Sequence, residues 1–394
     1  MARHLGARAI TPAVAAVAAV AAVSVLAMIP PAEGARPEPF ASGVPEPSNL
    51  AFDPRGRLWA TSGGNVAQAS NGVWLLGRDG SRPVQVVSGL YSALGLTWHG
   101  GRLYVSHVVP DRTNAPSHTG RVTAFWGFDG RRFRSSRVIV DGLPTGLHRV
   151  NSIVAGPRGR LYLGVGSVFD NRRASSRWSG TVVSFRPDGA DLRIEASGLR
   201  NPYGLAFLPG TGMLLISDHG RDDLGLRRPP EEVNLVDVAG PAPDFGFPDC
   251  FGQGGSACRG TRRPLARLAA HAAPGSIAVV ATSPTSAAAY VTEFGSSFQA
   301  QPTGGDVVAL RLTRGEGGWR ARTRRFAAGL GRQNPLGAAL GPDGALYVSL
   351  WSRREIVRFD LPRPLRAASA EPPRGAAVLS ALLRWLVGLL VTSA

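Results

Sequence analysis

One phrase recurs along the chain: an apolar opening, a turn of Pro and Gly, and a strand that ends in small residues. Clear copies are NLAFDPRGRLWATSGG, GLTWHGGRLYVSH, SIVAGPRGRLYLGVGS, GLAFLPGTGMLLISDHG and GAALGPDGALYVSLWS, and SAAAYVTEFGSS is a degenerate sixth copy without the turn. Most copies precede a second phrase of two strands ending in Gly-Leu, as in GTVVSFRPDGADLRIEASGL. Each unit therefore holds about four strands. Because such units cannot bury their faces alone, the repeat predicts an all-β, six-bladed β-propeller with four-stranded blades over residues 36–362.

The ends of the predicted propeller suggest how the ring closes. We expect the early segment PFASGV to lie beside REIVRFDL near residue 360. The longest departures from the repeat are Val108 to Gly120, Asp170 to Ser179 and Arg221 to Arg267, which are predicted to be loops on the rim. Function is expected at these loops or at the central axis.

Both flanks of the propeller are apolar. Residues 1–35 place two arginines ahead of an alanine- and valine-rich run and a small-residue segment, which indicates an export signal peptide, with an uncleaved anchor as the alternative. Residues 363–375 have the composition of a linker. Residues 376–394 carry leucines at helical spacing and predict an apolar C-terminal helix, which either enters a membrane, lies on its surface or packs on the protein. Arg384 would oppose a membrane span.

The formal net charge is +17, and all 44 basic residues are arginine. The arginines are scattered, with no aromatic interleaving and no nucleic-acid-binding motif. This pattern favours a solvated basic surface over a nucleic-acid site, and it is compatible with a small anionic ligand in a basic pocket.

The chain has two cysteines, Cys250 and Cys258, in the segment DCFGQGGSACRG. In an oxidising compartment two cysteines this close are expected to form one short-loop disulfide, whereas a metal site would need other ligands nearby. The sequence therefore predicts a disulfide between them.

Three phrases hold polar residues that core packing does not require: HRVNSIVAGPRGRLYLGVGS, GLRNPYGLAF and SDHGRDDLGLRRPPEEVNLV. Their order and wording resemble the glucose/sorbosone dehydrogenase family, six-bladed quinoproteins that use pyrroloquinoline quinone (PQQ). FGFPDCFG and VTEFGSSFQAQPTGGDVVAL continue the resemblance, which extends over most of Pro37 to Leu361.

The resemblance implies roles for individual residues. His148 would be the general base that takes a proton from a sugar hydroxyl, a role suited to an imidazole pKa near 6.5. Arg200 would stabilise negative charge on the quinone oxygen, and Asn201 would add a hydrogen bond to the cofactor. The backbone carbonyls of Gly220 and Arg221 would hold a Ca²⁺ that bridges to the cofactor.

The chain departs from the family's pattern at three places. Ser297 stands where a Trp is frequent, Gly220-Arg221 stands where Gly-Pro is common, and no lysine is present to reach the cofactor. Arg332, Arg353 and Arg354 are the candidates to replace that lysine as partners of an anion, with the different geometry of a guanidinium. Of these, Arg332 is the residue that we assign to the cofactor.

Two interpretations stay open for the polar residues. Without the resemblance, His148 would be a residue that holds a loop by hydrogen bonds. An acidic group is either a metal cluster or a solvated loop held against arginines: Asp218, Asp222, Asp223, Glu231 and Glu232.

The sequence thus indicates an exported sugar dehydrogenase of the aldose or sorbosone type, with PQQ and Ca²⁺ as cofactors and an external electron acceptor. The alternatives are a non-catalytic binding propeller that has lost the cofactor and a calcium-dependent lactonase-type hydrolase. Because His148 and Arg200 lead corresponding phrases in successive blades, we expect them at the same end of the pore.

Overall fold

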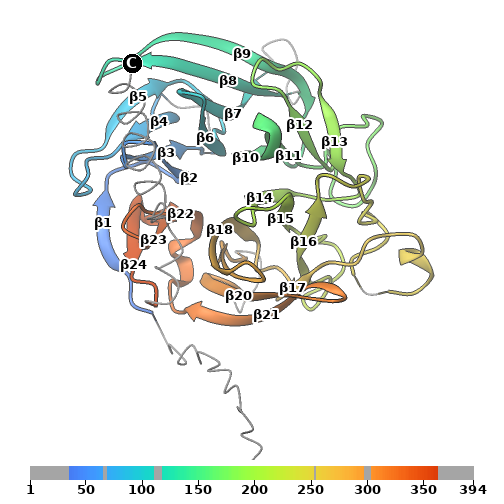
Figure 1. Ribbon diagram of the computed structural model, residues 1–394. Coiled ribbons are helices and arrows are strands. Elements are labelled where there is room, and N and C mark those ends of the chain that lie inside the picture. The colour runs from blue at the N-terminus through green and yellow to red at the C-terminus, as the bar shows by residue number, and fades with distance from the viewer. Residues whose placement is uncertain (1–34, 65–68, 111–117, 253, 297–302, 363–394) are drawn as a thin grey trace, which may run out of the picture. The chain divides into compact units, whose positions relative to one another are not determined.

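The computed structural model describes residues 35–64, 69–110, 118–252, 254–296 and 303–362. The strands in these ranges form six four-stranded antiparallel sheets around a central axis (Figure 1). The all-β, six-bladed propeller predicted from the repeat is confirmed. Among the described residues the only helical elements are 3₁₀ turns: η1 (Pro157–Gly159), η2 (Ser256–Cys258), η3 (Gly331–Gln333) and η4 (Trp351–Arg353).

The first three blades contain consecutive strands. Blade 1 comprises β2 (Pro47–Phe52), β3 (Leu58–Ser62), β4 (Gly72–Leu75) and β5 (Val84–Ser88). Blade 2 comprises β6 (Gly95–His99), β7 (Arg102–Pro110), β8 (His118–Phe128) and β9 (Phe133–Pro144). Blade 3 comprises β10 (Val150–Ala155), β11 (Leu161–Val165), β12 (Thr181–Phe185) and β13 (Arg193–Ala196).

The remaining blades include the one that closes the ring. Blade 4 comprises β14 (Pro202–Phe207), β15 (Met213–Asp218), β16 (Glu231–Asp237) and β17 (Ala266–Leu268). Blade 5 comprises β18 (Pro274–Ser283), β19 (Ser286–Glu293), β20 (Asp306–Gly315) and β21 (Gly318–Ala327). Blade 6 comprises β22 (Pro335–Leu340), β23 (Leu346–Leu350), β24 (Glu355–Phe359) and β1 (Glu38–Ser42).

Blade 6 takes its outermost strand from the beginning of the described chain. Strand β1 pairs antiparallel with β24, with Glu38 opposite Arg358 and Ser42 opposite Glu355. The expected pairing of PFASGV with REIVRFDL is confirmed. The pairing covers the edge of β24, which would otherwise expose unpaired backbone groups.

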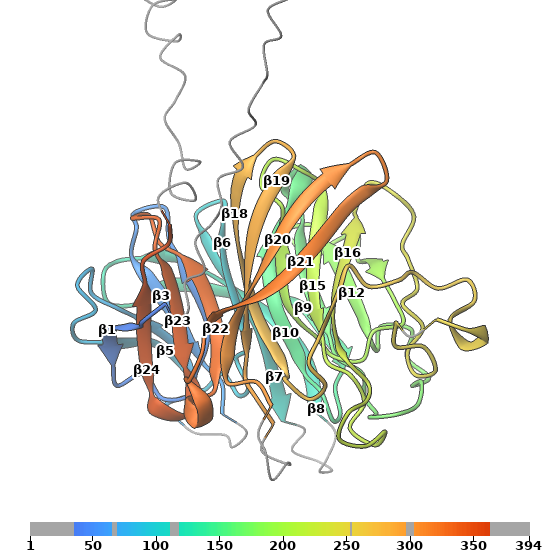
Figure 2. The same cartoon turned by 90° about the horizontal axis from the view of Figure 1, so that it is seen from below.

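The blades stand side by side around the axis (Figure 2). They pack against one another through apolar side chains. Trp59 of blade 1 is fully buried, with its ring centroid 5.1 Å from that of Trp98 in blade 2. Tyr162 of blade 3 and Phe207 of blade 4 meet edge to face at 4.9 Å. Each such aromatic pair adds about 0.5–1.5 kcal/mol beyond its area burial, which explains why the blades need their neighbours.

Near the axis, hydroxyl groups connect one strand or blade to the next. In blade 4 the Ser217 hydroxyl accepts the Gly204 N–H at 2.8 Å and donates to the Gly275 carbonyl of blade 5 at 2.7 Å. A Cβ on Gly204 would collide with that carbonyl. In blade 6 the Ser349 hydroxyl accepts the Gly337 N–H at 2.7 Å. The small residues that end each repeat therefore serve close approach at the axis.

Two of the three predicted rim loops need correction. The segment Arg221 to Arg267 contains β16, the third strand of blade 4, and the start of β17, because its Glu-Glu-Val-Asn phrase pairs with β15. Within Val108 to Gly120, strand β7 extends to Pro110 and β8 begins at His118. The segment Asp170 to Ser179 is a loop, as predicted.

The expectations for the termini concern residues that lie largely outside the described part. The signal or anchor segment 1–35, the linker 363–375 and the apolar helix 376–394 therefore stay predictions. No helix in the ranges given above is long and apolar enough to span a membrane.

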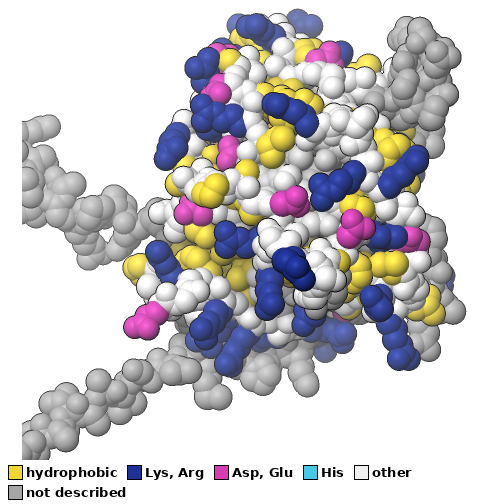
Figure 3. Space-filling view, turned by 90° about the vertical axis from the view of Figure 1, so that its right-hand side faces the viewer, with side chains coloured by type: hydrophobic (Ala, Val, Ile, Leu, Met, Phe, Trp, Pro, Cys, Tyr) yellow, Lys and Arg dark blue, Asp and Glu magenta, His cyan; other side chains and the backbone are white. Residues whose placement is uncertain are grey.

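Arginines are spread over the outer side of the propeller that Figure 3 presents, with acidic side chains between them rather than a continuous basic stripe. A dispersed surface of this kind fits the solvated basic surface expected from the sequence.

Candidate functional site

The leading residues of corresponding phrases lie at one end of the propeller. His148 stands two residues before β10, and Arg200 stands two residues before β14. Each of these strands is the innermost of its blade, so the two positions are equivalent by the blade repeat. The connections β11–β12 and β15–β16 lie at the same end, since the strands are antiparallel. These two connections and the two leading positions form the candidate site.

His148 is held as a neutral imidazole. Burial lowers its pKa well below the ordinary value, and the positive charge of Arg200 lowers it further. Its Nδ1 lies 2.8 Å from the Ser167 carbonyl oxygen, which accepts a hydrogen bond and therefore requires the proton on Nδ1. In this tautomer Nε2 keeps its lone pair, so the ring can accept a proton there.

Arg200 is only 3% exposed and sits between two loop carboxylates. Its Nη2 lies 2.5 Å from Asp170 Oδ1, on the β11–β12 connection, and 2.6 Å from Asp222 Oδ2, on the β15–β16 connection. Its Nε also donates to Asp170 Oδ1 at 3.1 Å. Arg200 thus fastens both loops to the end of the pore, while its Nη1 makes no hydrogen bond to a described residue.

Asn201 and His219 together connect blades 3, 4 and 5. Its Oδ1 accepts from Asn151 Nδ2 of blade 3 at 2.8 Å, and its Nδ2 lies 3.1 Å from His219 Nδ1. His219 Nε2 in turn lies 2.9 Å from the Pro274 carbonyl of blade 5. Burial lowers the pKa of His219 to about 4, so the ring is neutral, with Nε2 donating and Nδ1 accepting. Both ring nitrogens of His219 are therefore used, whereas His148 Nε2 makes no hydrogen bond to any residue that the structure describes.

Buried carboxyl groups surround the start of the β15–β16 connection. The Gly220 N–H donates to Glu231 Oε2 at 2.6 Å, and Asp218 accepts the backbone N–H groups of Arg200 and Asn201. Burial raises the pKa of Asp218 to about 7 and that of Glu231 to about 8. These side chains are structural acceptors that shape the loop on which Gly220 lies.

A small cavity of about 20 Å³ adjoins Gly220 and Arg221. Asp218 and Glu232 are also among its lining residues, and the Glu232 Oε1 atom is buried without a hydrogen-bond partner. The volume suffices for one water molecule or ion. An unpartnered carboxyl oxygen is a hard donor of the kind that Ca²⁺ prefers. No group of three or more His, Cys, Asp or Glu that could hold a metal occurs in the described ranges.

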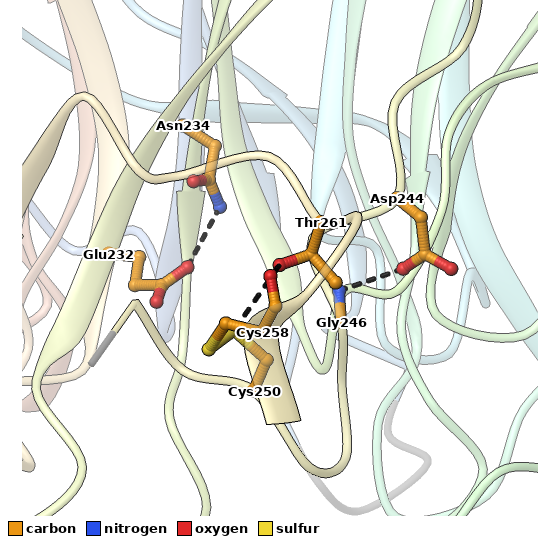
Figure 4. The surroundings of a disulfide bond; sticks show 7 residues. All are labelled: Glu232, Asn234, Asp244, Gly246, Cys250, Cys258 and Thr261. Atoms are coloured by element: carbon orange, nitrogen blue, oxygen red, sulfur yellow. Dashed lines mark hydrogen bonds between the residues drawn. A yellow bond between two sulfur atoms is a disulfide. The ribbon is translucent and has the colours of Figure 1, made fainter. Parts of the chain in front are cut away.

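The predicted disulfide between Cys250 and Cys258 is present (Figure 4). Thr261 steadies it, donating its hydroxyl to the Cys258 carbonyl at 2.9 Å and lying 3.4 Å from Cys250 Sγ. Glu232 and Asn234 lie beside it in Figure 4 and are joined by a 3.3 Å hydrogen bond. Since Cys250 also lines the small cavity, the disulfide helps to form its wall.

Other residues singled out from the sequence are dispersed. Arg332 is exposed in η3, three residues before β22, at the same end of blade 6. Arg353 pairs with Glu355 at 3.1 Å, and Arg354 takes a left-handed conformation after η4. Ser297 lies outside the described residues. Among the described residues, Arg332 shares no hydrogen-bond or ion-pair partner with Arg200.

The five acidic residues for which the sequence left a metal cluster or a solvated loop open fall into two sets. Asp222 pairs with Arg200, and Asp223 pairs with Arg221 at 2.7 Å, as expected of a loop held against arginines. Asp218, Glu231 and Glu232 are instead buried. No local sequence signal indicated the role of Asp170, because its partner Arg200 is 30 residues away along the chain.

Fold and site together define a six-bladed propeller with a neutral histidine and a buried arginine at one end of its axis. No family model matches the chain. One curated relative is an uncharacterized protein of Borreliella burgdorferi, 31% identical over 94 residues, a stretch that is 24% of either chain. The chain thus spans about a quarter of the length of this relative.

Solved structures match most of the chain. A proposed oxidoreductase (glucose dehydrogenase) from Thermus thermophilus is 25% identical, with a TM-score of 0.66 over 83% of this chain and 100% of that one. The PQQ-bound aldose sugar dehydrogenase of Streptomyces coelicolor is 20% identical, with a TM-score of 0.63 over 83% and 98%. A calcium structure of a Trichoderma reesei enzyme of carbohydrate-active family AA12 is 18% identical, with a TM-score of 0.67 over 84% and 96%. The resemblance to the glucose/sorbosone dehydrogenases is confirmed: the chain has the fold of PQQ-dependent sugar dehydrogenases.

Proposed function

We propose that this protein is an exported sugar dehydrogenase of the aldose or sorbosone type that uses PQQ and Ca²⁺. The observation that carries the proposal is the tautomer of His148, whose Nδ1–H is held by the Ser167 carbonyl beside the buried Arg200. A neutral imidazole with a free Nε2 at the end of a propeller axis is suited to general-base chemistry. The fold shared with sugar dehydrogenases supports the substrate class.

Unused hydrogen-bonding capacity supports a cofactor at this end. Arg200 Nη1 and the second amide hydrogen of Asn201 Nδ2 make no hydrogen bond to a described residue, so they could donate to an anionic, carbonyl-bearing group, and Arg332 would supply a further cation. PQQ, when bound, would accept the hydride that leaves the sugar carbon. His148 would take the hydroxyl proton at Nε2, and Arg200 would stabilise the negative charge on the quinone oxygen.

Calcium would be held by the backbone carbonyls of Gly220 and Arg221. The small cavity beside them and the unpartnered Glu232 Oε1 fit a hard cation. Removal of calcium with a chelator should abolish dye reduction, and added Ca²⁺ should restore it. Activity that is unaffected by chelation would remove calcium from the proposal.

The main test is reconstitution of the purified full chain with PQQ and Ca²⁺, followed by a sugar panel with an artificial electron acceptor. His148→Ala should lower turnover by about 10²- to 10⁴-fold while the absorbance of bound quinone persists. His99→Ala is the matched control and should keep full activity. His99 is the last residue of β6, the innermost strand of blade 2, and therefore lies at the end of the propeller opposite the candidate site. A fully active His148→Ala protein would show that His148 only holds its loop.

One observation favours a second candidate, a binding propeller without catalysis. Two carboxylates already occupy Arg200, and no lysine is present to replace it as an anion partner. This candidate predicts that PQQ leaves the thermal stability of the protein unchanged, whereas a cofactor bound at 100 times its Kd would stabilise it by about 2.7 kcal/mol. The lactonase-type alternative lacks a comparable supporting observation.

A further inference from the structure

A second, larger cavity lies next to the candidate site. It has a volume of about 140 Å³ and is enclosed by the β11–β12 connection and the segment between β13 and β14. Since a water molecule needs about 10–15 Å³ of such space, the cavity has room for several. Five of its lining residues carry hydroxyl groups: Ser167, Ser176, Ser179, Thr181 and Ser197.

The charged side chains of this cavity are both cationic. Arg173 and Arg177 line it, and no Asp or Glu of the described ranges is among its lining residues. Arg173 has only a long ion pair, 3.7 Å to Asp244, in which both side chains are largely exposed. Arg177 lies over the Trp178 ring at 4.2 Å from the centroid and forms no ion pair with a described residue. Since exposed ion pairs contribute little, the cavity keeps an excess of positive charge.

The hydroxyl groups retain capacity for a ligand. The Ser179 hydroxyl accepts the Val168 N–H at 3.1 Å, and Thr181 donates to the Trp178 carbonyl at 2.7 Å. Each hydroxyl has one donor and two acceptor sites, so neither is saturated. The hydroxyls of Ser176 and Ser197 make no hydrogen bond to another described residue. A hydroxyl-rich wall with two guanidinium groups suits a polyhydroxylated anion.

The chain connects this cavity to the candidate site. Ser167 lines the cavity and also accepts the hydrogen bond from His148 through its carbonyl. Leu199, another lining residue, directly precedes Arg200, and the Ser167 N–H donates to the Arg200 carbonyl at 2.6 Å. A molecule in the cavity would therefore contact Ser167, which holds the proposed base His148 by a hydrogen bond. It would also contact Leu199, the residue directly before the buried Arg200.

We propose that this cavity binds the anionic group of a sugar, a carboxylate or a phosphate, with the sugar hydroxyls on the serine-lined wall. Binding of an acidic sugar in this cavity does not depend on the proposed dehydrogenase function. Oxidation of that sugar does depend on it. The protein would then prefer acidic sugars over neutral ones, because Arg173 and Arg177 gain a charge-assisted partner only from the former.

The test is calorimetric binding of glucuronate, glucose 6-phosphate and glucose to the purified full chain without PQQ. The acidic sugars should bind at least ten times more tightly than glucose, and inorganic phosphate should compete. The double variant Arg173→Gln/Arg177→Gln should weaken their binding about 10- to 100-fold and leave glucose unchanged. The control is Arg186→Gln, which should leave binding of all three sugars unchanged. Arg186 is exposed, pairs with Asp188 and follows the end of β12 that is farthest from the cavity. The better-bound acidic sugar identifies the anion as carboxylate or phosphate.

Equal binding of glucose and both acidic sugars, or an unchanged affinity in the double variant, would overturn the inference. The reconstituted enzyme separates this failure from failure of the proposed function. Acidic-sugar binding without dye reduction would refute the dehydrogenase function and keep the cavity assignment. Dye reduction with equal kcat/KM for glucose and glucuronate, unaltered in the double variant, would support the dehydrogenase function and refute the cavity assignment.

Discussion

Blades 4 and 6 share a frame and differ in what they bury. In both, a serine of the second strand accepts the N–H of a glycine in the innermost strand, Ser217 from Gly204 and Ser349 from Gly337. At the end of that second strand, however, blade 4 has Asp218 paired in register with Glu232. Blade 6 has Leu350 opposite Glu355 at the corresponding place.

The difference separates two tasks of the same repeat. The glycine and serine positions serve backbone approach, which every blade needs around the axis. The strand ends carry no such requirement, so blade 4 can bury Arg200, Asp218 and Glu232, whereas blade 6 places Glu355 in a partly exposed pair with Arg353. Polar groups buried at a cost in free energy are expected where binding or chemistry takes place.

The largest expected effect concerns the arginines of the two blades. Arg200→Leu should lower turnover of the reconstituted enzyme about 10²- to 10³-fold, because it removes the donor for the developing negative charge, and should weaken PQQ binding. Arg353→Leu removes only an exposed ion pair and should leave turnover within about twofold. Steady-state kinetics and quinone titration measure both; equal effects of the two variants would contradict the contrast between the blades.

The next effect depends on pH. Burial raises the pKa of Glu232 to about 8, so the folded protein holds this proton while the unfolded chain releases it near pH 4.5. Stability from this group is therefore complete below about pH 4.5 and is lost as pH rises to about 8. In the presence of a calcium chelator, Glu232→Gln should raise the free energy of unfolding by about 2–4 kcal/mol at pH 9 and by little at pH 4.

Glu355→Gln, at the corresponding position of blade 6, is the control for this experiment. Its partly exposed side chain should give a change below about 0.5 kcal/mol at either pH. Denaturant unfolding at the two pH values measures both variants. A pH-independent effect of Glu232→Gln would show that its carboxyl is already ionised in the folded protein.

Blade 4 also has a covalent constraint that blade 6 lacks. Replacing Cys250 and Cys258 together by serine should lower the free energy of unfolding by about 2–3 kcal/mol, the loop-entropy value for a short closed segment. A reducing agent should lower the melting temperature of the native protein to about that of the double variant. It should leave the melting temperature of the double variant unchanged. Thermal unfolding with and without reductant provides the measurement, and no response of the native protein would contradict it.

The smallest expected difference between the blades, about 1 kcal/mol, concerns the shared serines. Ser217→Ala leaves the Gly204 N–H and the Gly275 carbonyl of blade 5 without their partner and should cost about 2–3 kcal/mol. Ser349→Ala leaves only the Gly337 N–H and should cost about 1–2 kcal/mol. Chemical denaturation of both variants tests the difference. A larger cost for Ser349→Ala would mean that the bond between blades contributes nothing.

The repeat predicted the frame because its signals are local. Turn glycines and alternating strands lie within a few residues of one another, so six blades and the closing pair β1–β24 followed from the sequence. The cysteine pair was predicted for the same reason. Strand β16 was missed because its Glu-Glu start resembles a polar loop, and only pairing with β15 shows that both carboxyls are buried.

The contacts of the candidate site were beyond local reasoning. The resemblance identified His148 and Arg200, but the partners Asp170 and Asp222 come from two different loops, and their approach depends on how blades 3 and 4 pack. The tautomer of His148 likewise depends on the carbonyl of Ser167, a backbone group that carries no sequence signal.

The pairing of β1 with β24 has a consequence for how the protein reaches its native state. Because Glu38 meets Arg358, the last blade cannot assemble until nearly the whole propeller sequence has been delivered. Contacts so far apart in sequence slow folding, and until they form β24 offers an open edge to other chains. Chaperone binding during synthesis would shield that edge, and yield would be limited by aggregation of intermediates more than by the stability of the finished ring.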